Sequence, residues 1–506
     1  MLFKIISASL QGIEGYPVEV EVDISPGLPG YITVGLPDAA VRDSKERVRA
    51  ALKNCGYDLD SRKITINLAP ADRRKEGSAF DLPIALGILA YLDVVSSEGL
   101  QDYLFLGELA LDGRLKPARG VLPIALTAKK LGLRGIVVPK MNAKEASLVQ
   151  DLPVFGLENL VDVARFLAAP DAIRPSRFAL DELLPPPPDS ADFEEVKGQY
   201  HVKRALEVAA SGAHNVLLVG PPGAGKTMLA RRLPSILPDM SFDEIIEVTQ
   251  IYSAAGLLVD SGAFNRRPFR APHHTITDPA LIGGGLVPRP GEVSLAHRGV
   301  LFLDELPEFR RRVLEDLRQP LEDGRVAVAR SSMSVLFPSS FMLVAAMNPC
   351  EDVFRGLAGS KGGCTESEKA RYYAKISGPL LDRIDIQVEV PEVKFKDIVS
   401  KAPGECSAAI RVRVTEARKR QLARFMGRKI YANAQMGPRD IKRHCAVSSE
   451  AEKLLETAVT RLGFSARAYD RILKVARTIA DLEGKDDMAT AHVSEAIQYR
   501  TLDKFR

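Results

Sequence analysis

The sequence has few cysteines, and the five that it has are scattered along 506 residues. A small extracellular domain that depends on disulfides usually carries an even number of closely spaced cysteines, and this chain shows neither feature. We therefore expect a protein of a reducing compartment, the cytoplasm. The five residues are Cys55, Cys350, Cys364, Cys406 and Cys445.

Long apolar runs and an excess of charge of one sign are also missing. No uninterrupted apolar run approaches the roughly 20 residues that a membrane-spanning helix needs, and the N-terminus lacks the basic-then-apolar pattern of a secretion signal. Lys and Arg number 69 against 65 Asp and Glu, a formal net charge of +4. This small net charge does not argue for nucleic acid binding, so a DNA site would have to come from a local basic patch.

The composition is that of an ordinary globular protein, with 46% hydrophobic and 26% charged residues. Because 506 residues exceed one hydrophobic core, we expect two or three domains. The predicted fold class is α/β. An α+β domain occupies residues 1–168, and a nucleotide-binding domain with a parallel sheet occupies residues 192–395. Residues 396–506 show helical spacing of Ala, Leu, Glu, Lys and Arg, which favours a small all-helical lid.

A composition break separates the first two domains. Residues 169–191 are rich in proline, and Pro185 to Pro188 are consecutive. Consecutive prolines favour the extended polyproline II conformation, so we interpret this segment as a semi-rigid linker.

Residues 220–227 read GPPGAGKT and fit the phosphate-binding loop pattern G-x-x-x-x-G-K-[ST] at every fixed position. The apolar run 215–219 predicts a strand before the loop, and residues 228–233 predict a helix after it. Glycines let backbone N–H groups converge on phosphates, the helix N-terminus adds partial positive charge, and Lys226 adds a full one. Thr227 offers its hydroxyl to Mg²⁺. The predicted nucleotide-binding loop consists of Gly220, Pro221, Pro222, Gly223, Ala224, Gly225, Lys226 and Thr227.

Two further apolar strands carry polar residues at their C-terminal ends. Residues 299–303 precede Asp304 and Glu305, and residues 341–347 precede Asn348. We assign Asp304 to the magnesium shell, Glu305 to orienting and polarising the attacking water, and Asn348 to positioning that water. A buried strand with two acids at its exposed end is the structural alternative. The preceding phosphate loop favours an ATP-hydrolysing core.

Three more segments go beyond a generic phosphate-loop ATPase. Residues 192–199, which end in Gln199, look like the adenine-side box of AAA+ ATPases. Arg383, within residues 377–385, suits an arginine finger directed at the γ-phosphate of a neighbouring subunit; the alternative is a salt-bridged surface arginine. Arg467, at a predicted helix start, suits a lid arginine over the phosphates.

Several segments together point to one family. They include residues 30–43, residues 269–275 (FRAPHHT) and residues 290–297 (PGEVSLAH), beside the Asp304 strand and the Arg383 motif. Over essentially its whole length the chain resembles the magnesium-chelatase-like AAA+ proteins of the bacterial ComM/YifB family. The resemblance implies a homo-hexameric ATPase ring that uses ATP and Mg²⁺.

The resemblance also implies a function. It implies a DNA motor, a branch-migration helicase in natural transformation or recombination, whose partners are single-stranded or branched DNA, further copies of itself and recombination proteins, with no membrane. A chelatase-type protein-remodelling ATPase that works with a partner protein is the second interpretation. An ATP-dependent protease is the third.

The chain departs from the family in one segment. Family members carry Cys-Pro-Cys after the asparagine of the third strand and a Cys-x-Cys further on, a plausible metal-binding set. Here only Cys350 and Cys364 occupy those stretches. Because a closed structural zinc site usually takes four ligands, we do not expect a zinc site in this loop.

The N-terminal domain resembles the proteolytic domain of Lon, whose catalytic pair is a serine and a lysine. Residues 75–86 align with the nucleophile segment and residues 107–114 with a later strand. The alignment places Ala79 at the nucleophile position and Leu122 at the lysine position, with Ser78 one residue away. Because a serine without an adjacent base is a weak nucleophile, we interpret the domain as non-catalytic and used for assembly or for DNA. The chelatase motor subunit that the core resembles lacks this domain, which weakens the second interpretation.

Two segments are candidates for DNA contact in the pore of a ring. Residues 321–332 predict a hairpin with a turn at Gly324 and two arginines, Arg325 and Arg330. Arginine contacts to phosphates would be salt-dependent and largely sequence-independent, as a branch-migration motor requires. Salt bridges at a subunit interface are the alternative role of these arginines.

The second segment is the stretch 266–285, which we interpret as a long insertion whose glycines suit a mobile pore loop. It contains the adjacent histidines His273 and His274. Adjacent side chains point in different directions on a strand, which argues against a metal site at this pair.

Overall fold

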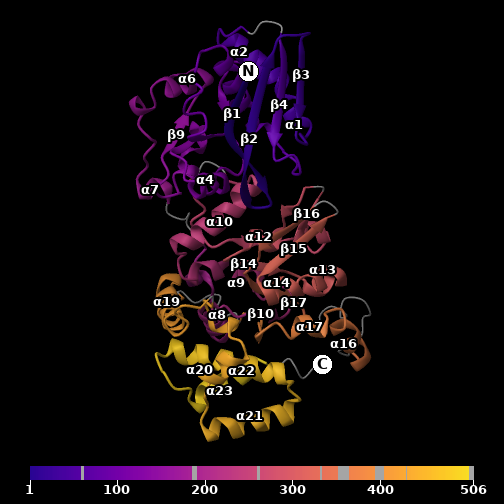
Figure 1. Cartoon of the computed structure of the whole chain (residues 1–506). Helices are drawn as coiled ribbons and strands as arrows, with labels where there is room; N and C mark the ends of the chain where they lie inside the picture. Colours follow the sequence, from indigo (N-terminus) through magenta and orange to yellow (C-terminus); the bar gives the residue numbers. More distant parts are fainter. Residues whose placement is uncertain are drawn as a thin grey trace. The chain divides into compact units, whose positions relative to one another are not determined.

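The computed structural model describes residues 1–58, 62–184, 191–258, 262–285, 287–330, 333–350, 364–393, 404–428 and 430–500. The chain forms two compact units (Figure 1). Both contain helices and strands, in agreement with the predicted α/β class. The first unit consists of Met1–Pro186 with Ser241–Asn265, and the second of Pro187–Met240 with Arg266–Arg506. The finer division at 168, 191 and 395 stays a prediction.

The first unit is built on a seven-stranded mixed sheet in the order β3-β4-β2-β1-β5-β8-β9. Strand β2 runs antiparallel to β1 and to β4, and the other neighbours are parallel. Every second residue of β2 from Tyr16 to Ile24 is buried, so its period-two apolar pattern places one face on the core. The strands are β1 (Leu2–Gln11), β2 (Glu14–Ser25), β3 (Gly30–Val34), β4 (Lys63–Ala69), β5 (Tyr103–Phe105), β8 (Gly135–Pro139) and β9 (Val154–Leu157).

Helix α3 (Asp81–Tyr91) lies at the centre of this unit and contacts β1 and β2. It is apolar around its whole circumference, and ten of its eleven residues are buried, as expected of a helix that is covered on all sides. The other elements are α1 (Ala39–Arg42), α2 (Ser44–Asn54), α4 (Val121–Lys130), α5 (Ala143–Ala146), α6 (Leu160–Ala168), α7 (Leu180–Leu183) and the short pair β6 (Glu108–Leu109) and β7 (Leu115–Lys116).

Helix α10 (Phe242–Ala255) belongs to the first unit although it follows the phosphate-loop helix in the chain. Its Ser253 hydroxyl donates to the carboxylate of Glu145, which also accepts from the backbone N–H of Leu122 at 2.9 Å. Burial raises the pKa of the Glu145 carboxyl. The side chain of Gln250 donates to the carbonyl of Ile13 at 2.8 Å. Polar contacts between distant segments therefore place α10 in this unit.

Part of the predicted linker 169–191 packs on the first unit. The Ser176 backbone N–H donates to Val154 at 2.7 Å, and its hydroxyl accepts from the N–H of Gly156. The four consecutive prolines, Pro185 to Pro188, lie outside the described residues.

The second unit is built on a five-stranded sheet in the order β11-β14-β17-β10-β18, with every neighbour parallel. All residues of β10, β14 and β17 are buried, as expected of parallel strands that are covered on both faces. Because the strands are parallel, the residues that follow β10, β14 and β17 meet at one edge of the sheet. The strands are β10 (Val216–Val219), β11 (Phe269–Arg270), β14 (Val300–Leu303), β17 (Met342–Met347) and β18 (Ile386–Glu389).

The segment predicted as a long pore-loop insertion is partly regular. Phe269 and Arg270 form the edge strand of the sheet, because they pair in parallel with β14. Beyond them lie α11 (Asp278–Ile282) and the two-stranded pair β12 (Gly283–Gly284) and β13 (Arg289–Pro290).

A hairpin forms near the predicted place, but its turn is not at Gly324. This glycine ends helix α14 (Arg318–Asp323) with φ of +64°, a left-handed conformation that suits glycine as a helix C-cap. The antiparallel pair is β15 (Arg325–Arg330) with β16 (Met333–Pro338). The prediction of the turn was wrong because a glycine that ends a helix and one that turns a hairpin look alike in sequence.

From residue 407 onward, the described part of the chain is helical. Its helices are α19 (Ser407–Arg424), α20 (Pro438–His444), α21 (Ser449–Leu462), α22 (Ala466–Leu482) and α23 (Thr490–Gln498). The remaining helices of the second unit are α8 (Tyr200–Gly212), α9 (Lys226–Arg232), α11, α12 (Glu292–Leu295), α13 (Arg311–Asp316), α14, α16 (Glu366–Tyr373) and α17 (Gly378–Leu381). No helix in the described ranges combines the length and apolarity needed to cross a bilayer.

A buried polar network joins α22 to the sheet. The Asp385 carboxylate, just before β18, lies 3.1 Å from Nδ1 of His214 and accepts from the guanidinium of Arg471. His214 Nε2 lies 2.8 Å from the hydroxyl of Thr478. Burial opposes ionisation of Asp385, but the Arg471 charge and the His214 hydrogen bond outweigh it and hold the pKa of Asp385 well below its usual range. The ionised carboxylate therefore stabilises the contact between helix and sheet.

Asp385→Asn is expected to lower the free energy of unfolding of this unit by about 3 kcal/mol, because it leaves the buried charge of Arg471 uncompensated. The folded-state pKa of Asp385 lies below that of an unfolded aspartate, so its stabilisation is complete above about pH 4 and is lost as the pH falls further. Hydrogen exchange of α22 in denaturant at neutral and acid pH measures the effect. Asp487→Asn, at an exposed aspartate, is the control. An equal loss at both pH values would contradict the assignment.

Candidate nucleotide-binding site

The backbone of the phosphate loop requires glycine at particular positions. A Cβ at Gly220 would lie 2.1 Å from the carbonyl oxygen of Val390, so no side chain fits there. Gly225 caps α9 with φ of +89°, which strains any residue that has a side chain. The loop therefore begins against the segment after β18 and ends at the N-terminus of α9, where N–H groups point away from the helix.

Lys226 is buried and points back into the loop. Its Nζ donates to the carbonyls of Gly220 at 2.6 Å and Pro221 at 2.8 Å, and to Oδ1 of Asn348 at 2.9 Å. The structure therefore brings together the lysine of the loop and the polar residue that follows β17, as expected from the strand order.

Thr227 and Asp304 also meet at this edge of the sheet. The Thr227 hydroxyl donates to Oδ2 of Asp304 at 2.6 Å, and Oδ1 of Asp304 accepts from the backbone N–H of Glu305 at 3.0 Å. A hydroxyl and a carboxylate are oxygen ligands of the kind that Mg²⁺ prefers. The two residues would therefore be suitable oxygen ligands of Mg²⁺.

Glu305 projects from the sheet with its side chain 57% exposed and its backbone at φ +54°. Its Oε2 lies 3.3 Å from Nδ1 of His274. The sequence prediction missed this partner, because nothing in the spacing of 274 and 305 indicates contact. The expectation that the two histidines diverge was also wrong: they lie in a turn beyond β11, and the ring centroids of His273 and His274 are 4.1 Å apart. In the described ranges, no three His, Cys, Asp or Glu side chains are grouped to hold a metal ion.

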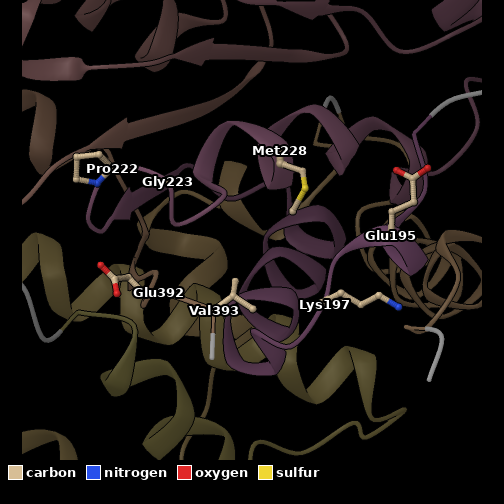
Figure 2. Close-up of a pocket in the computed structure, with 7 residues that line it drawn as sticks. All are labelled: Glu195, Lys197, Pro222, Gly223, Met228, Glu392 and Val393. Atoms are coloured by element: carbon tan, nitrogen blue, oxygen red, sulfur yellow. The ribbon is translucent and has the colours of Figure 1, made fainter. Parts of the chain in front are cut away.

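A pocket of about 360 Å³ opens beside the loop. Figure 2 shows its lining side chains, which come from the predicted adenine-side segment, from the loop with α9, and from the residues after β18. Its position and size suit the base of a nucleotide whose phosphates lie on the loop. The lining residues are Glu195, Lys197, Pro222, Gly223, Met228, Glu392 and Val393.

The side chain of Gln199 is hydrogen-bonded to the backbone of the phosphate loop. Its Nε2 donates to the carbonyl of Ala224 at 2.7 Å and to that of Pro391 at 3.2 Å, and the residue is buried. The predicted adenine-side segment thus contributes Glu195 and Lys197 to the pocket and Gln199 to the loop's position.

Both predicted arginines pair with groups of the same chain. The Arg383 guanidinium donates to Glu322 and, at 2.8 Å, to the carbonyl of Pro379. Arg467, in the first turn of α22, is 68% exposed and lies 3.6 Å from Asp382. Their roles at the γ-phosphate stay predictions.

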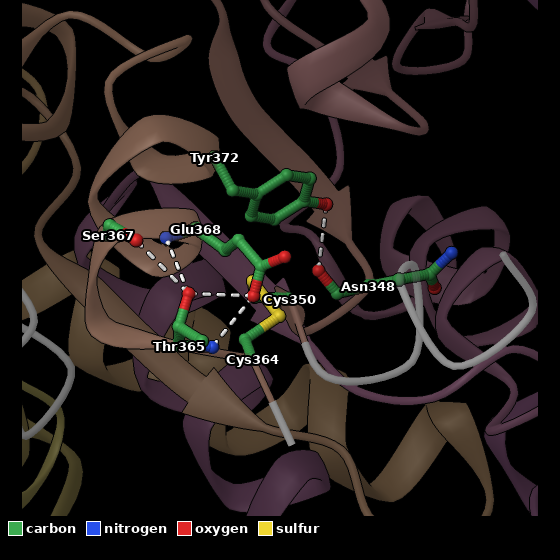
Figure 3. Close-up of a disulfide and its surroundings, with 7 residues drawn as sticks. All are labelled: Asn348, Cys350, Cys364, Thr365, Ser367, Glu368 and Tyr372. Carbon is green, nitrogen blue, oxygen red and sulfur yellow. Dashed lines mark hydrogen bonds between the residues drawn. A yellow bond between two sulfur atoms is a disulfide. The ribbon is translucent and has the colours of Figure 1, made fainter. Parts of the chain in front are cut away.

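A disulfide joins Cys350 to Cys364, close to the site (Figure 3). Cys350 comes two residues after Asn348, whose carbonyl accepts from the hydroxyl of Tyr372 at 2.9 Å. The sequence analysis did not predict this disulfide, since closeness in space cannot be read from a separation of 14 residues. Cys55, Cys406 and Cys445 are free.

The aligned Lon positions hold no serine–lysine pair in the first unit. Leu122 is buried on α4, and the buried Lys75 donates to backbone carbonyls, including that of Arg73 at 2.8 Å. The hydroxyl of Ser78 donates to the carboxylate of Glu108. The sequence did not indicate this contact with Glu108 of strand β6, and the interpretation of the domain as non-catalytic stays a prediction.

Comparison with known proteins identifies the family. Family models described as "Subunit ChlI of Mg-chelatase", "Magnesium chelatase, subunit ChlI" and "Magnesium chelatase, subunit ChlI C-terminal" match residues 20–142, 192–398 and 404–500. Competence protein ComM of Haemophilus influenzae is 42% identical over 501 residues, which cover 98% of this chain and 97% of that protein. YifB of Escherichia coli is also 42% identical over 501 residues, covering 97% and 96%. The chain belongs to the ComM/YifB family of magnesium-chelatase-like proteins.

ComM/YifB membership confirms the resemblance seen in the sequence. It places the chain among the magnesium-chelatase-type AAA+ ATPases, a family that implies use of ATP and Mg²⁺. Similarity to a magnesium-chelatase subunit itself is more limited. The magnesium-chelatase 67 kDa subunit of Chlorobaculum parvum is 27% identical over 167 residues, which cover 32% of this chain and 24% of that protein.

Proposed function

We propose that this ComM/YifB protein is an ATP-driven DNA motor that assembles as a six-membered ring and moves branched DNA during transformation or recombination. The observation that carries the proposal is the 42% identity to a competence protein over 98% of the chain. That similarity includes the first unit, whereas the similarity to the 67 kDa chelatase subunit covers only 32% of the chain.

The geometry of the site supports ATP hydrolysis as the source of work. Lys226 would exchange its carbonyl partners for the phosphates of ATP, and Asn348 would stay beside it to orient water. Thr227 and Asp304 would hold Mg²⁺, which neutralises charge on the phosphates. Glu305 would take a proton from the attacking water. Each of these groups is already at the edge of the sheet where the phosphate loop ends.

Assembly would complete the site from a neighbouring subunit. Arg383 is bound by Glu322 in the single chain, an ion pair that leaves the arginine 14% exposed. A neighbour's phosphate carries more negative charge than one carboxylate and is the stronger partner for a guanidinium. We therefore propose that, when the ring assembles with ATP, the Arg383 guanidinium leaves Glu322 and binds the γ-phosphate of the ATP held by the neighbouring subunit.

The β15–β16 hairpin is the proposed DNA contact. Val326 and Val328 are buried and Arg325 and Ala327 are exposed, so the strand presents one face to the unit and the other outward. Arg325 thereby lies on the outward face at the base of the hairpin. The side chain of Arg330, near the tip, lies outside the described part of the structure.

Arg325→Ala combined with Arg330→Ala is expected to weaken DNA binding roughly tenfold. The slope of log K against log[salt] should become shallower by the amount that corresponds to one to two phosphate contacts. ATP turnover without DNA should stay near the wild-type rate, because the hairpin does not contribute to the phosphate loop. Electrophoretic binding to forked, four-way and single-stranded DNA, with and without ATP, measures the effect. The matched control is Lys419→Ala with Arg420→Ala, which removes two exposed charges from α19.

A chelatase-type protein-remodelling ATPase is the second candidate, because the model of magnesium chelatase subunit ChlI matches residues 192–398. An assembled hexamer that hydrolyses ATP yet has no affinity for DNA at low salt would reject the DNA motor and favour this candidate.

A further inference from the structure

The seven-stranded sheet of the first unit has one uncovered edge. Strand β3 ends the sheet order and, among the described residues, pairs on one side alone, with β4 (Figure 1). Strand β9 ends the other side, and its outer edge already bonds to Ser176, whose N–H donates to Val154 and whose hydroxyl accepts from the N–H of Gly156. An uncovered edge presents N–H and C=O groups that can pair with a further strand. The edge open to such pairing is therefore that of β3.

Large apolar side chains on β3 and its flanks face solvent. Ile32 and Val34 are two residues apart in the strand, so they share one face of it. Leu28 before the strand and Leu36 after it are exposed as well, and the exposed fractions of the four residues run from 44% to 89%. Apolar side chains gathered in this way on a surface mark interaction sites. The edge of β3 therefore offers both backbone groups and apolar side chains to a partner.

The segment around β3 carries no charge. Residues 26–37 read PGLPGYITVGLP and contain no Asp, Glu, Lys or Arg. Exposed edge strands usually carry a charge or a proline that prevents pairing with a second edge. Pro29 and Pro37 flank β3 and limit the length over which it can pair, but neither a proline nor a charge lies inside the strand. Two copies of such a segment would meet without repulsion between like charges.

The segment is also complementary to itself. When two copies of β3 pair antiparallel about a two-fold axis at Ile32, this residue faces its own counterpart. Val34 of each copy then falls opposite Gly30 of the other copy, which has no side chain to exclude it. Just beyond the paired strands, the same register brings Leu28 of one copy toward Leu36 of the other. The exposed apolar positions therefore match when the segment is read against itself in the opposite direction.

We propose that β3 pairs antiparallel with β3 of a second copy of this chain and joins the two seven-stranded sheets into one. Head-to-tail pairing of β3 with β9 is blocked, because Ser176 already bonds to β9. Pairing about a two-fold axis uses both uncovered edges at once, so the assembly stops at two copies. A two-fold contact cannot lie between neighbours in a cyclic ring. In the proposed six-membered ring, this contact would therefore join subunits of two rings.

Analytical ultracentrifugation of the full chain without nucleotide measures the association. The wild-type chain should pass from one copy to two with a Kd on the order of 10 µM, because one short strand and a few apolar side chains make a small interface. Ile32→Lys with Val34→Lys should weaken the association at least about tenfold, since like charges would then face each other. The matched control is Leu111→Lys with Leu131→Lys, at exposed leucines outside the segment, which should associate as wild type does.

A cysteine at the axis tests the register. Ile32→Cys, treated with oxidised glutathione, should give chains linked in pairs by a disulfide, because the two Cβ atoms would lie within its reach. Leu131→Cys is the control and should give no more linked chains than wild type. A single copy at every concentration, or equal association of wild type and the double lysine variant of β3, would overturn the proposal. Association without a link through Ile32→Cys would overturn the pairing of β3 with itself.

Discussion

ATP binding is expected to fall by at least about a hundredfold in Lys226→Ala, since truncating one partner of a buried charge pair costs several kcal/mol. The lysine is buried at the loop and hydrogen-bonded to Gly220, Pro221 and Asn348, so no other cation in the described contacts of that loop takes its place. Titration with a fluorescent ATP analogue measures the loss. Lys419→Ala, at an exposed lysine of α19, is the matched control and should bind normally.

Glu305→Gln should behave differently at the same site. Binding should persist, because Thr227 and Asp304 keep their contact, whereas hydrolysis should slow by a factor on the order of 10² to 10⁴, the range of general-base catalysis. Single-turnover hydrolysis measures the rate. Equal loss of nucleotide binding in Lys226→Ala and Glu305→Gln would contradict the separate roles assigned to them.

A large effect is also expected for Arg383→Ala. This variant should bind ATP but hydrolyse it on the order of 10³-fold more slowly, the scale of a missing arginine finger. Mixing it with Lys226→Ala should restore part of the activity. At random equal mixing, about a quarter of the interfaces would join an intact phosphate loop to an intact Arg383. Coupled ATPase assays across mixing ratios measure the rescue.

The control for Arg383 is its partner in the single chain. Glu322→Ala frees the guanidinium without removing it and should leave hydrolysis in the assembled ring near the wild-type rate. Rings shown to be mixed, yet without rescue at any ratio, would make Arg383 a structural arginine. Loss of activity in both Arg383→Ala and Glu322→Ala would point to the ion pair itself.

Much of the nucleotide site could be predicted because its determinants are local. The phosphate loop is one continuous segment, and its glycines are dictated by backbone geometry at Gly220 and Gly225. Asp304 and Asn348 could be placed because parallel strands bring their C-terminal ends to one edge, and both follow buried apolar runs. Polar residues after such strands are therefore brought together by topology alone.

Other features could not be predicted because they depend on contacts between distant segments. The pairing of His274 with Glu305 and the disulfide between Cys350 and Cys364 join side chains whose closeness no sequence pattern indicates. Helix α10 joins the first unit through Ser253, although the chain around it belongs to the second. The periodicity and spacing of residues report only local structure, so they do not predict contacts between distant segments.

The amino-acid sequence by itself determined the family, the α/β class, and which polar residues follow the strands β10, β14 and β17 at one end of the sheet. Each of these follows from patterns within a few neighbouring residues, where backbone geometry and burial impose the residue type. Only the tertiary structure decided that Gly324 ends a helix, that Arg383 pairs with Glu322, and that His274 lies beside Glu305. These contacts depend on which surfaces meet when whole helices and strands pack together. The free energy of this packing comes from many residues that are distant in sequence, so no single segment predicts it.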